Sequence, residues 1–412
     1  MRTIVSISLL ACLLLSTAAS AENWSRFRGP NGAGQSDDDQ IPTTWQPTNY
    51  LWKQPLPGIG HSSPVIWDKH LFLTWADSAT GAQTVAAYDV ETGANLWQKQ
   101  FEAPKYHIND LNSFASSTPA VDAQSVYVLW LKDGKVILAA INHQGEERWR
   151  QDIGPFKEVH GFGISPVVVD DLVYVNRSSG TDSAITAFDR DTGDVRWNLP
   201  QDAGTTAFST PCLLDPTAQH KVLLTTNTSS GLVAIDALTG KIVWQGLKDD
   251  LDQRCVSSPI VGDGMIIVGS GQGGNGKAVI AARPGDNGSP PQEVYRLIQN
   301  APQCPTPVIA GDLLFVWSDH GVASCYDLAT GKQYWRQRIG GDFYSSPIRV
   351  GNRIFGFSRG GDAIVLAADK HYELLARNEI GELCEGTPAI ANGRMFVRTD
   401  STLLCIGQPN SN

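Results

Sequence analysis

The sequence is poor in basic side chains and lacks the short motifs of several common enzyme classes. Of its 412 residues, 32 are Lys or Arg and 42 are Asp or Glu, which gives a formal net charge of −10. Because phosphate binding depends on clustered cations, this balance argues against a nucleic-acid partner. There is no C-x-x-C-H motif for a c-type haem and no G-x-x-x-x-G-K-[ST] motif for a phosphate-binding loop. The chain also has no Pro-, Ser- or charge-rich linker, so we expect one folded domain.

A short unit repeats along the chain. Residues 234–244 read A-I-D-A-L-T-G-K-I-V-W, in which apolar runs flank an Asp and a Thr-Gly pair. This pattern predicts a β-hairpin whose Asp and Gly form the turn and whose Trp covers a neighbouring sheet. The same spacing recurs at Asp89 to Trp97, Asp189 to Trp197 and Asp327 to Trp335, with a weaker copy at Asn142 to Trp149. The repetition indicates a role in architecture.

A second marker, a small residue pair followed by Pro, appears eight times at intervals of 40 to 55 residues. Its copies end at Pro64, Pro119, Pro166, Pro211, Pro259, Pro307, Pro347 and Pro388. The period suits four short strands, so the sequence predicts an all-β fold, an eight-bladed β-propeller of four-stranded antiparallel blades.

The two ends of the repeat region predict how the ring closes. Residues 51–54 resemble the Trp-bearing outer strand of a blade that has no earlier strands. The last marker is followed by only three apolar segments, at 389–391, 395–398 and 403–406. We therefore expect the strand of Trp52 to pair with residues 403–406, so that N- and C-terminal strands share one blade and leave no open edge.

The N-terminus predicts export. Residues 1–21 combine an early cation, an apolar run and Ala19-Ser20-Ala21, the pattern of a signal peptide cleaved near Ala21. The protein should be periplasmic or extracellular, and it would touch a membrane only if Cys12, in a lipoprotein-like L-L-A-C box, carried a lipid. Residues 22–48 form a Gly-rich irregular strap with Trp24 and Phe27 as anchors, which we interpret as packing rather than ligand contact. The propeller would occupy residues 49–408.

Together, the D-x-x-T-G-x-x-x-W hairpins, the [ST]-P strand starts and the W-x-x-F-R-G-P-x-G-x-G opening resemble the secreted pyrroloquinoline-quinone-like (PQQ-like) propeller repeat proteins. The resemblance covers nearly all of the chain after residue 21. The wider superfamily includes quinoprotein alcohol dehydrogenases, which bind PQQ and Ca²⁺ on the axis, and BamB-like scaffolds of outer-membrane protein assembly. Since both share the repeat, it does not distinguish enzyme from scaffold. The adjacent Cys pair typical of the dehydrogenases is missing here.

If the blades are equivalent, residues that precede each Pro marker, or that end a second strand, converge on one funnel-shaped face. Such a concave group of aromatic, cationic and acidic side chains suits a ligand or partner site, although a propeller mouth also needs such residues to fill its taper. The candidates are His61, Trp75, Phe114, Trp130, His160, Phe162, Arg177, Arg254, Gln303, Trp317, His320, Tyr344, Arg359, Glu382 and Glu385.

Three cysteines, Cys255, Cys304 and Cys384, also lie shortly before their markers and should face the funnel. Export permits disulfides, and Cys255 with Cys304 on adjacent blades is the best candidate pair. A soft-metal site that adds His61 or His160 is the weaker alternative, because metal-binding cysteines normally occur as closely spaced pairs. We expect no metal.

The sequence favours an exported, non-catalytic and monomeric propeller that needs no cofactor and binds a protein, peptide or saccharide across its funnel. The alternative is a dehydrogenase of alcohols or sugars that uses PQQ and Ca²⁺. In that case Arg254 or Arg359 would hold a quinone carboxylate, and Glu382 or Glu385 would help to bind Ca²⁺.

Overall fold

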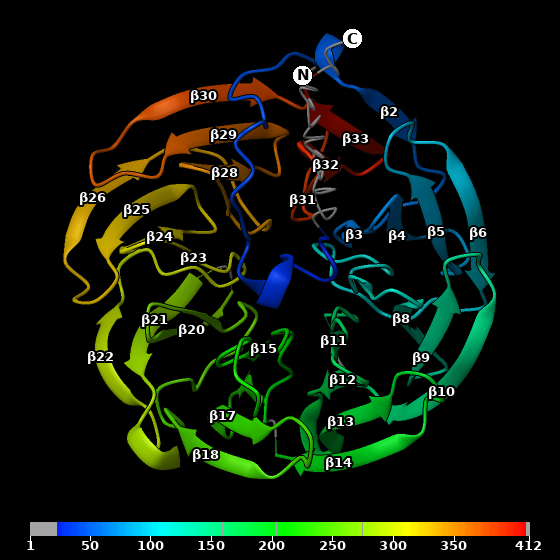
Figure 1. Ribbon diagram of the computed structural model, residues 1–412, viewed down its shortest axis with the longest axis horizontal. Coiled ribbons are helices and arrows are strands. Elements are labelled where there is room, and N and C mark those ends of the chain that lie inside the picture. The colour runs from blue at the N-terminus through cyan, green and yellow to red at the C-terminus, as the bar shows by residue number, and fades with distance from the viewer. Residues whose placement is uncertain (1–22, 158–159, 203, 274, 409–412) are drawn as a thin grey trace, which may run out of the picture.

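The computed structural model describes residues 23–157, 160–202, 204–273 and 275–408, and it consists of sheets arranged radially around a central axis (Figure 1). There are eight sheets, each built on four antiparallel strands. In seven of them these four strands run outward from the axis in chain order, and the eighth takes its outermost strand from the start of the chain. One sheet carries a short fifth strand that pairs in parallel with its innermost strand. The prediction of an eight-bladed β-propeller is confirmed. The predicted signal peptide and Cys12 lie outside the described residues.

From the axis outward, the first four blades are β3 (Val65–Trp67), β4 (His70–Ala76), β5 (Gln83–Asp89) and β6 (Asn95–Phe101); β7 (Ala120–Val121), β8 (Ser125–Lys132), β9 (Lys135–Asn142) and β10 (Glu147–Pro155); β11 (Val167–Val169), β12 (Leu172–Arg177), β13 (Ser183–Asp189) and β14 (Val195–Gln201); and β15 (Cys212–Leu213), β16 (Val222–Asn227), β17 (Gly231–Asp236) and β18 (Ile242–Gly246). The short 3₁₀-helix η3 (Gly180–Asp182) precedes β13.

The next three blades are β19 (Ile260–Gly262), β20 (Met265–Gln272), β21 (Asn275–Arg283) and β22 (Gln292–Leu297), with η4 (Asp286–Gly288) before β22; β23 (Val308–Ala310), β24 (Leu313–Trp317), β25 (Val322–Asp327) and β26 (Gln333–Arg338); and β27 (Ile348–Val350), β28 (Arg353–Phe357), β29 (Asp362–Ala367) and β30 (Leu374–Glu379). The last blade is β31 (Ala389–Ala391), β32 (Arg394–Arg398), β33 (Thr402–Gly407) and, outermost, β2 (Trp52–Pro55).

The ring closes as predicted, because β2 from the start of the chain pairs with β33 from its end. Trp52 lies opposite Cys405 and Gln54 lies opposite Leu403 in an antiparallel register. The backbone N–H of Leu51 extends this pairing with a 2.9 Å hydrogen bond to the Cys405 carbonyl. Closure within one blade leaves no unpaired strand between the two ends of the chain.

The repeated Trp joins neighbouring blades. The Trp52 indole lies against the turn of the next blade and donates from Nε1 to the Val90 carbonyl at 3.0 Å. Gly93 in that turn has φ +71°, and a Cβ there would lie 2.6 Å from the Trp52 ring. Trp97, Trp149 and Trp197 repeat the contact, donating to carbonyls of the following blade at 2.7 to 3.0 Å. The Thr-Gly pair is therefore required both by the turn and by the Trp that packs on it.

The [ST]-P marker also joins blades, but close to the axis. The N–H of Ser63 donates to the Thr118 hydroxyl of the next blade at 2.9 Å. The same bond recurs around the axis, for example from Thr306 to Ser346 at 3.0 Å, and it returns from Thr387 to Ser63 at 3.0 Å. We call the residues before the eight prolines the hydroxyl ring; they are Ser63, Thr118, Ser165, Thr210, Ser258, Thr306, Ser346 and Thr387.

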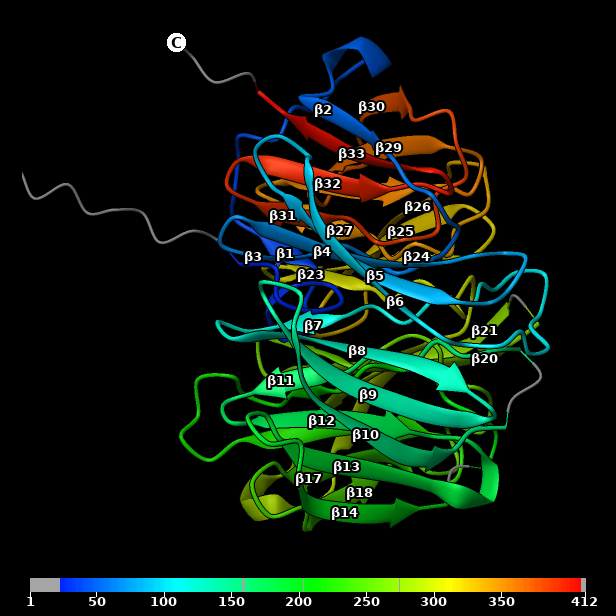
Figure 2. The ribbon, with the colours of Figure 1, turned by 90° about the vertical axis from the view of Figure 1, so that its right-hand side faces the viewer.

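Residues 23–48 start beside the innermost strand β3, pass over the centre of the ring and then run out to its rim, so that they close one end of the axis (Figures 1 and 2). This strap contains η1 (Pro30–Gly32) and β1 (Gln35–Ser36) and is followed by η2 (Pro47–Asn49); β1 pairs in parallel with β27. Trp24 is fully buried and exchanges two backbone hydrogen bonds with Ile66 at 2.9 and 3.0 Å.

Arg28 locks the strap onto the axis. Its buried guanidinium donates to the carbonyls of Thr306, Pro307 and Pro347 at 2.9 to 3.3 Å, as well as to two carbonyls of the strap itself. Burial lowers the pKa of Arg28 to about 9. The strap thus fills one end of the axis with a cation that is solvated by backbone carbonyls. Among the described residues, no helix is long and apolar enough to cross a membrane.

Candidate functional site

A cavity of about 380 Å³ lies on the axis, on the other side of the hydroxyl ring from the strap. Its walls are loops that lead into the inner strands, so that each blade of the ring can contribute residues far apart in sequence. Seven members of the hydroxyl ring line it, and Phe27 of the strap reaches it from the closed end. The cavity is therefore built jointly by the propeller and the N-terminal segment.

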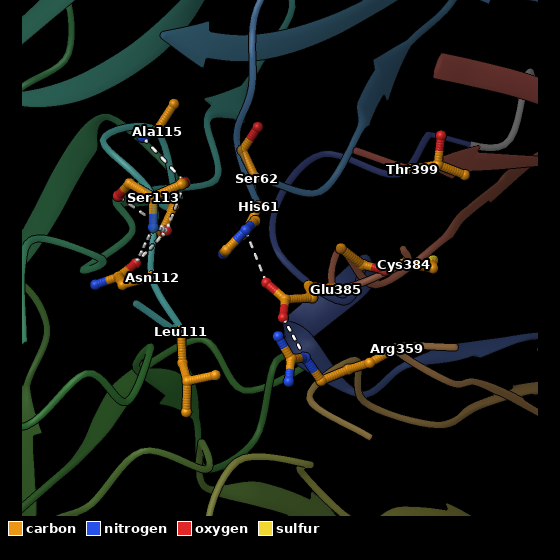
Figure 3. A network of polar contacts seen from close by, with 12 residues as sticks. His61, Ser62, Leu111, Asn112, Ser113, Ala115, Arg359, Cys384, Glu385 and Thr399 are labelled. Carbon is orange, nitrogen blue, oxygen red and sulfur yellow. Dashed lines mark hydrogen bonds and ion pairs between the residues drawn. The ribbon is translucent and has the colours of Figure 1, made fainter. Parts of the chain in front are cut away.

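The most polar wall is organised around the Glu385 carboxylate, which precedes β31 and is 3% exposed. His61 Nε2 lies 2.7 Å from Glu385 Oε2, and Arg359 Nε lies 2.5 Å from Glu385 Oε1. Figure 3 shows the His61 and Arg359 side chains pointing toward the carboxylate, with Leu111 and Asn112 facing them across the open centre. Burial alone would raise the pKa of Glu385, but hydrogen bonds and charges from His61 and Arg359 lower it below its usual value. Glu385 is accordingly ionised and paired on both oxygens.

Two further side chains continue this wall. The Arg359 guanidinium lies over the Tyr344 ring, 4.8 Å from its centre, and burial raises the pKa of Tyr344. Beside them, Cys304 and Gln303 lead into β23. Their backbone N–H groups both donate to Asp319, at 3.0 and 2.7 Å.

The Cys304 thiol is held in its neutral form. Burial, followed by the negative charge of Asp319 and a hydrogen bond to it, raises the pKa of Cys304 well above the ordinary thiol value. Burial also raises the pKa of Asp319, against the two N–H bonds that it accepts. A neutral thiol is a weak nucleophile and a weak metal ligand, so Cys304 is not set up for chemistry of its own.

The opposite wall comes from the loops before β7, β11, β15 and β19. Asn112 donates to the His160 carbonyl at 2.6 Å and accepts from the Ser116 hydroxyl at 2.5 Å. Arg254 lies over the Phe208 ring at 5.8 Å. This wall therefore combines an aromatic surface with amide, hydroxyl and guanidinium groups.

The structure brings only some of the predicted site residues to this cavity. Lining it are His61, His160, Arg254, Gln303, Cys304, Tyr344 and Glu385, and Arg359 contacts it through Glu385. Trp75, Trp130 and Trp317 were expected at the rim but are buried. Trp130 stacks on Phe101 of the preceding blade at 4.2 Å, and Trp317 packs on Phe343 at 5.3 Å. The ends of second strands thus face an adjacent blade rather than the mouth.

The remaining predicted residues have other surroundings. Phe114 and Phe162 are buried in edge-on pairs with Tyr106 and Phe156. Arg177 is buried and donates to the Pro155 carbonyl at 2.8 Å. His320 is exposed and lies 3.2 Å from Asp342. Glu382 accepts hydrogen bonds from the hydroxyls of Thr399, Ser401 and Thr402, at 2.6 to 3.1 Å.

All six cysteines in the described part of the chain are free thiols. Cys304 lines the cavity, whereas Cys255 and Cys384 were expected to face it but are buried. Cys384 donates to the Arg398 carbonyl at 3.5 Å, and Cys255 contacts the Gln253 carbonyl at 3.8 Å. The structure therefore shows no bridge between Cys255 and Cys304.

The donor set does not suit the calcium ion of the dehydrogenases. Calcium takes six to eight oxygen ligands, usually including several carboxylates. Among the described lining residues the one carboxylate is Glu385, and its two oxygens already pair with His61 and Arg359. The described part of the chain also has no group of three His, Cys, Asp or Glu side chains placed to hold a metal.

Sequence reasoning missed several residues of the cavity. It assigned Phe27 to packing, and it treated the Ser and Thr of each marker as architecture. Asp319, which fixes the Cys304 loop, has no motif that would distinguish it. The marker itself was the available signal, because a hydroxyl at one position in every blade must form a ring when the blades close.

Comparisons with known proteins agree with the fold. The family described as outer membrane protein assembly factor BamB matches residues 46–129, 81–296 and 297–372. The BamB of Shewanella oneidensis is 22% identical over 229 residues, which is 54% of this chain and 51% of the relative. The match therefore spans about half the length of that relative.

Solved structures of two kinds share the architecture. BamB from Moraxella catarrhalis superposes with a TM-score of 0.61 and 15% identity, covering 88% of this chain and 98% of that one. A europium-containing methanol dehydrogenase superposes with a TM-score of 0.68 and 14% sequence identity, covering 94% of this chain and 98% of that one. A quinohemoprotein alcohol dehydrogenase from Comamonas testosteroni superposes with a TM-score of 0.68 and 15% sequence identity, covering 96% of this chain and 82% of that one. At these sequence identities the likeness shows the fold alone, because the similar structures include both BamB and dehydrogenases. By its repeats, its closed ring and the family match over most of its length, the chain belongs to the BamB family of PQQ-like β-propeller proteins.

Proposed function

We propose that this protein is an exported, non-catalytic propeller that binds a segment of a protein partner in its axial cavity. The observation that carries the proposal is the cavity itself: it is mostly walled by loops, open at one end, closed by the strap at the other, and contains no activated nucleophile among its described residues. Its volume of about 380 Å³ is in the range of small ligand sites and suits one or two residues of a partner.

The state of the titratable groups supports a binding role. An activated nucleophile needs a lowered pKa or an adjacent free base. Here Glu385 is paired with His61 and Arg359, and the Cys304 thiol is protonated. The same groups give a ligand fixed polar contacts. We infer that no cofactor takes part.

The segment at residues 1–21 supports export to the periplasm or beyond, with cleavage near Ala21 and a lipid on Cys12 as the variant that would add a membrane anchor. The family is named for the assembly of outer-membrane proteins, and the strands of such proteins alternate apolar and polar residues. We propose that the cavity binds extended segments with this alternation. The protein acts as a monomer.

Calorimetric titration of the purified exported protein tests this proposal. The probes are an eight-residue peptide of alternating apolar and polar residues that ends in Phe, and an oligosaccharide of similar mass. Gly163 lines the cavity without a positive φ, and a Cβ there would lie 3.6 Å from the Phe208 ring. Gly163→Phe should therefore fill the cavity and weaken peptide binding at least tenfold. Leu238→Phe, at a turn position that is 72% exposed, should bind like the wild type.

The dehydrogenase alternative predicts a different result. With PQQ and Ca²⁺ added, we expect no saturable reduction of a dye by alcohols or sugars. Turnover that Gly163→Phe abolishes would contradict the proposed function. Peptide binding that is unchanged in Gly163→Phe would place the partner site elsewhere.

A further inference from the structure

The hydroxyl ring presents donors that the protein does not use. Seven of the eight hydroxyl oxygens in the ring accept a backbone N–H from the preceding blade, as Thr118 does from Ser63 and Ser258 from Thr210, both at 2.9 Å. The hydroxyl hydrogen remains available. Among the described residues, no hydroxyl of the ring donates to a protein acceptor, although most of these side chains are buried. Buried donors of this kind normally find a partner.

Positive charge accumulates directly behind the ring. Arg26 and Arg28 are buried at the strap end of the axis and form no ion pair within the described part of the chain. Arg28 is solvated by carbonyls alone, and Nε of Arg26 has no hydrogen-bond partner. The protein as a whole carries a net charge of −10, so this cationic axis runs against the sign of the rest of the molecule. Uncompensated cations in a buried site favour an anion nearby.

Apolar side chains also line the cavity, beside the polar groups around Glu385 and Asn112. Phe27 reaches it from the strap, Phe208 lies on one wall, and Leu111, which is 46% exposed, lies at the opening. A ligand must therefore offer an apolar group to Phe27 and Phe208 and oxygen acceptors to the hydroxyls around them. An internal peptide segment or a neutral saccharide offers acceptors without a charge, whereas the last residue of a polypeptide offers an apolar side chain beside a carboxylate.

We propose that the cavity binds the C-terminal residue of the partner, with its apolar side chain against Phe27 and Phe208 and its carboxylate among the hydroxyl donors, in the field of the two buried arginines. This inference rests on the proposed function, since it specifies which part of a partner enters the cavity. The residues before the terminus would leave through the opening past Leu111. Recognition of the terminal carboxylate would make the site selective for chain ends.

The test compares three probes by calorimetry at one ionic strength: the eight-residue peptide ending in Phe as a free acid, the same peptide as a C-terminal amide, and 3-phenylpropionate. The free acid should bind at least about tenfold more tightly than the amide, the scale of one hydrogen bond to a charged group. The small acid represents a free metabolite, and it should bind more weakly than the peptide acid because it lacks the contacts at the opening.

Two variants of one ring residue locate the effect. Thr210→Val removes a hydroxyl of the cavity, whereas Thr210→Ser keeps it. Thr210→Val should reduce the preference for acid over amide by about threefold or more, and Thr210→Ser should retain it. Because the preference is a ratio measured on one folded sample, a loss of stability does not produce the result.

The outcomes separate the two proposals. Equal binding of acid and amide, with binding still lost in Gly163→Phe, overturns the C-terminal assignment and leaves the proposed function intact. A preference for the acid that survives in Thr210→Val overturns the role of the ring. Tighter binding of 3-phenylpropionate than of the peptide acid assigns the site to a free small acid instead. No binding of any of the three probes contradicts both proposals.

Discussion

The two ends of the axis use the same ring of inner strands in opposite ways. At the strap end, the carbonyls of Thr306, Pro307 and Pro347 meet the guanidinium of Arg28, and the donors and acceptors satisfy one another. At the cavity end, the hydroxyls of the same ring keep their hydrogens free for a ligand. The difference divides the axis into a packed end that stabilises the ring and an open end that we propose as the binding site.

The largest effect is expected at the packed end. Arg28→Met would leave several buried carbonyls without donors, while it removes a buried charge that is costly in itself. We expect the first effect to exceed the second, with a loss of about 3 to 5 kcal/mol in the free energy of unfolding. Urea denaturation of the purified protein measures it. Arg349→Gln, which breaks a pair with the exposed Asp37, should cost less than about 1 kcal/mol. A similar loss in both variants would contradict the account of the packed end.

A pair of glycines tests how closely the strap is packed. Both Gly29 and Gly134 have positive φ, but a Cβ at Gly29 would lie 2.6 Å from the Trp24 ring, whereas a Cβ at Gly134 would meet no atom within 4 Å. Gly134→Ala should cost about 1 kcal/mol from backbone strain alone, and Gly29→Ala about 2 to 3 kcal/mol. Thermal unfolding of the two variants gives the difference. Equal losses of stability in the two variants would mean that the strap shifts to make room for the added Cβ.

At the cavity end, the expected effect of a charge change is smaller and depends on pH. Glu385→Gln removes a carboxylate that pairs with His61 and Arg359, and we expect a loss of about 1 to 2 kcal/mol in the free energy of unfolding near pH 7. The pKa of Glu385 is lower in the folded protein than in the unfolded chain, so its contribution is complete above about pH 4.3 and is lost as pH falls through the folded pKa. Melting curves of the wild type and Glu385→Gln should therefore converge below pH 4. A difference that is constant down to pH 3 would exclude this ion pair as its source.

The smallest expected effect concerns the reactivity of the Cys304 thiol. Asp319→Asn removes the negative charge that helps to keep this thiol protonated, which should lower its pKa and increase its thiolate fraction. Alkylation by iodoacetamide at pH 8, followed at Cys304 by mass spectrometry, should become about threefold to tenfold faster. The buried Cys384 serves as the internal control, because its rate reports general opening of the fold. Equal acceleration of both thiols would indicate unfolding instead.

Much of the fold could be predicted because each blade carries its own local signals. The Thr-Gly turn and the Trp identified the hairpins, and the single strand around Trp52 identified the closure with Cys405. The cavity was harder, because strand position alone does not distinguish an opening from a contact between blades. Trp130 near the end of β8 and His61 in the loop before β3 were both expected on the funnel face, yet one packs on Phe101 and the other pairs with Glu385.

The role of Phe27 depends on the path of the strap over the centre of the ring, and no local sequence pattern encodes that path. Similarly, the hydroxyl ring is visible in the sequence as Ser or Thr before each Pro, but its hydrogen bonds exist only between neighbouring blades. Local turn chemistry was therefore readable, whereas contacts made by ring closure had to come from the structure.

Hydrogen–deuterium exchange with and without the peptide acid tests the division of the axis most directly. The account predicts that the amides of residues 24–36 exchange as slowly as those of the inner strands in both states. It also predicts that the peptide slows exchange mainly in the loops at 109–116, 160–163 and 303–306. Fast exchange in residues 24–36, or protection gained on the outer strands instead of these loops, would contradict it.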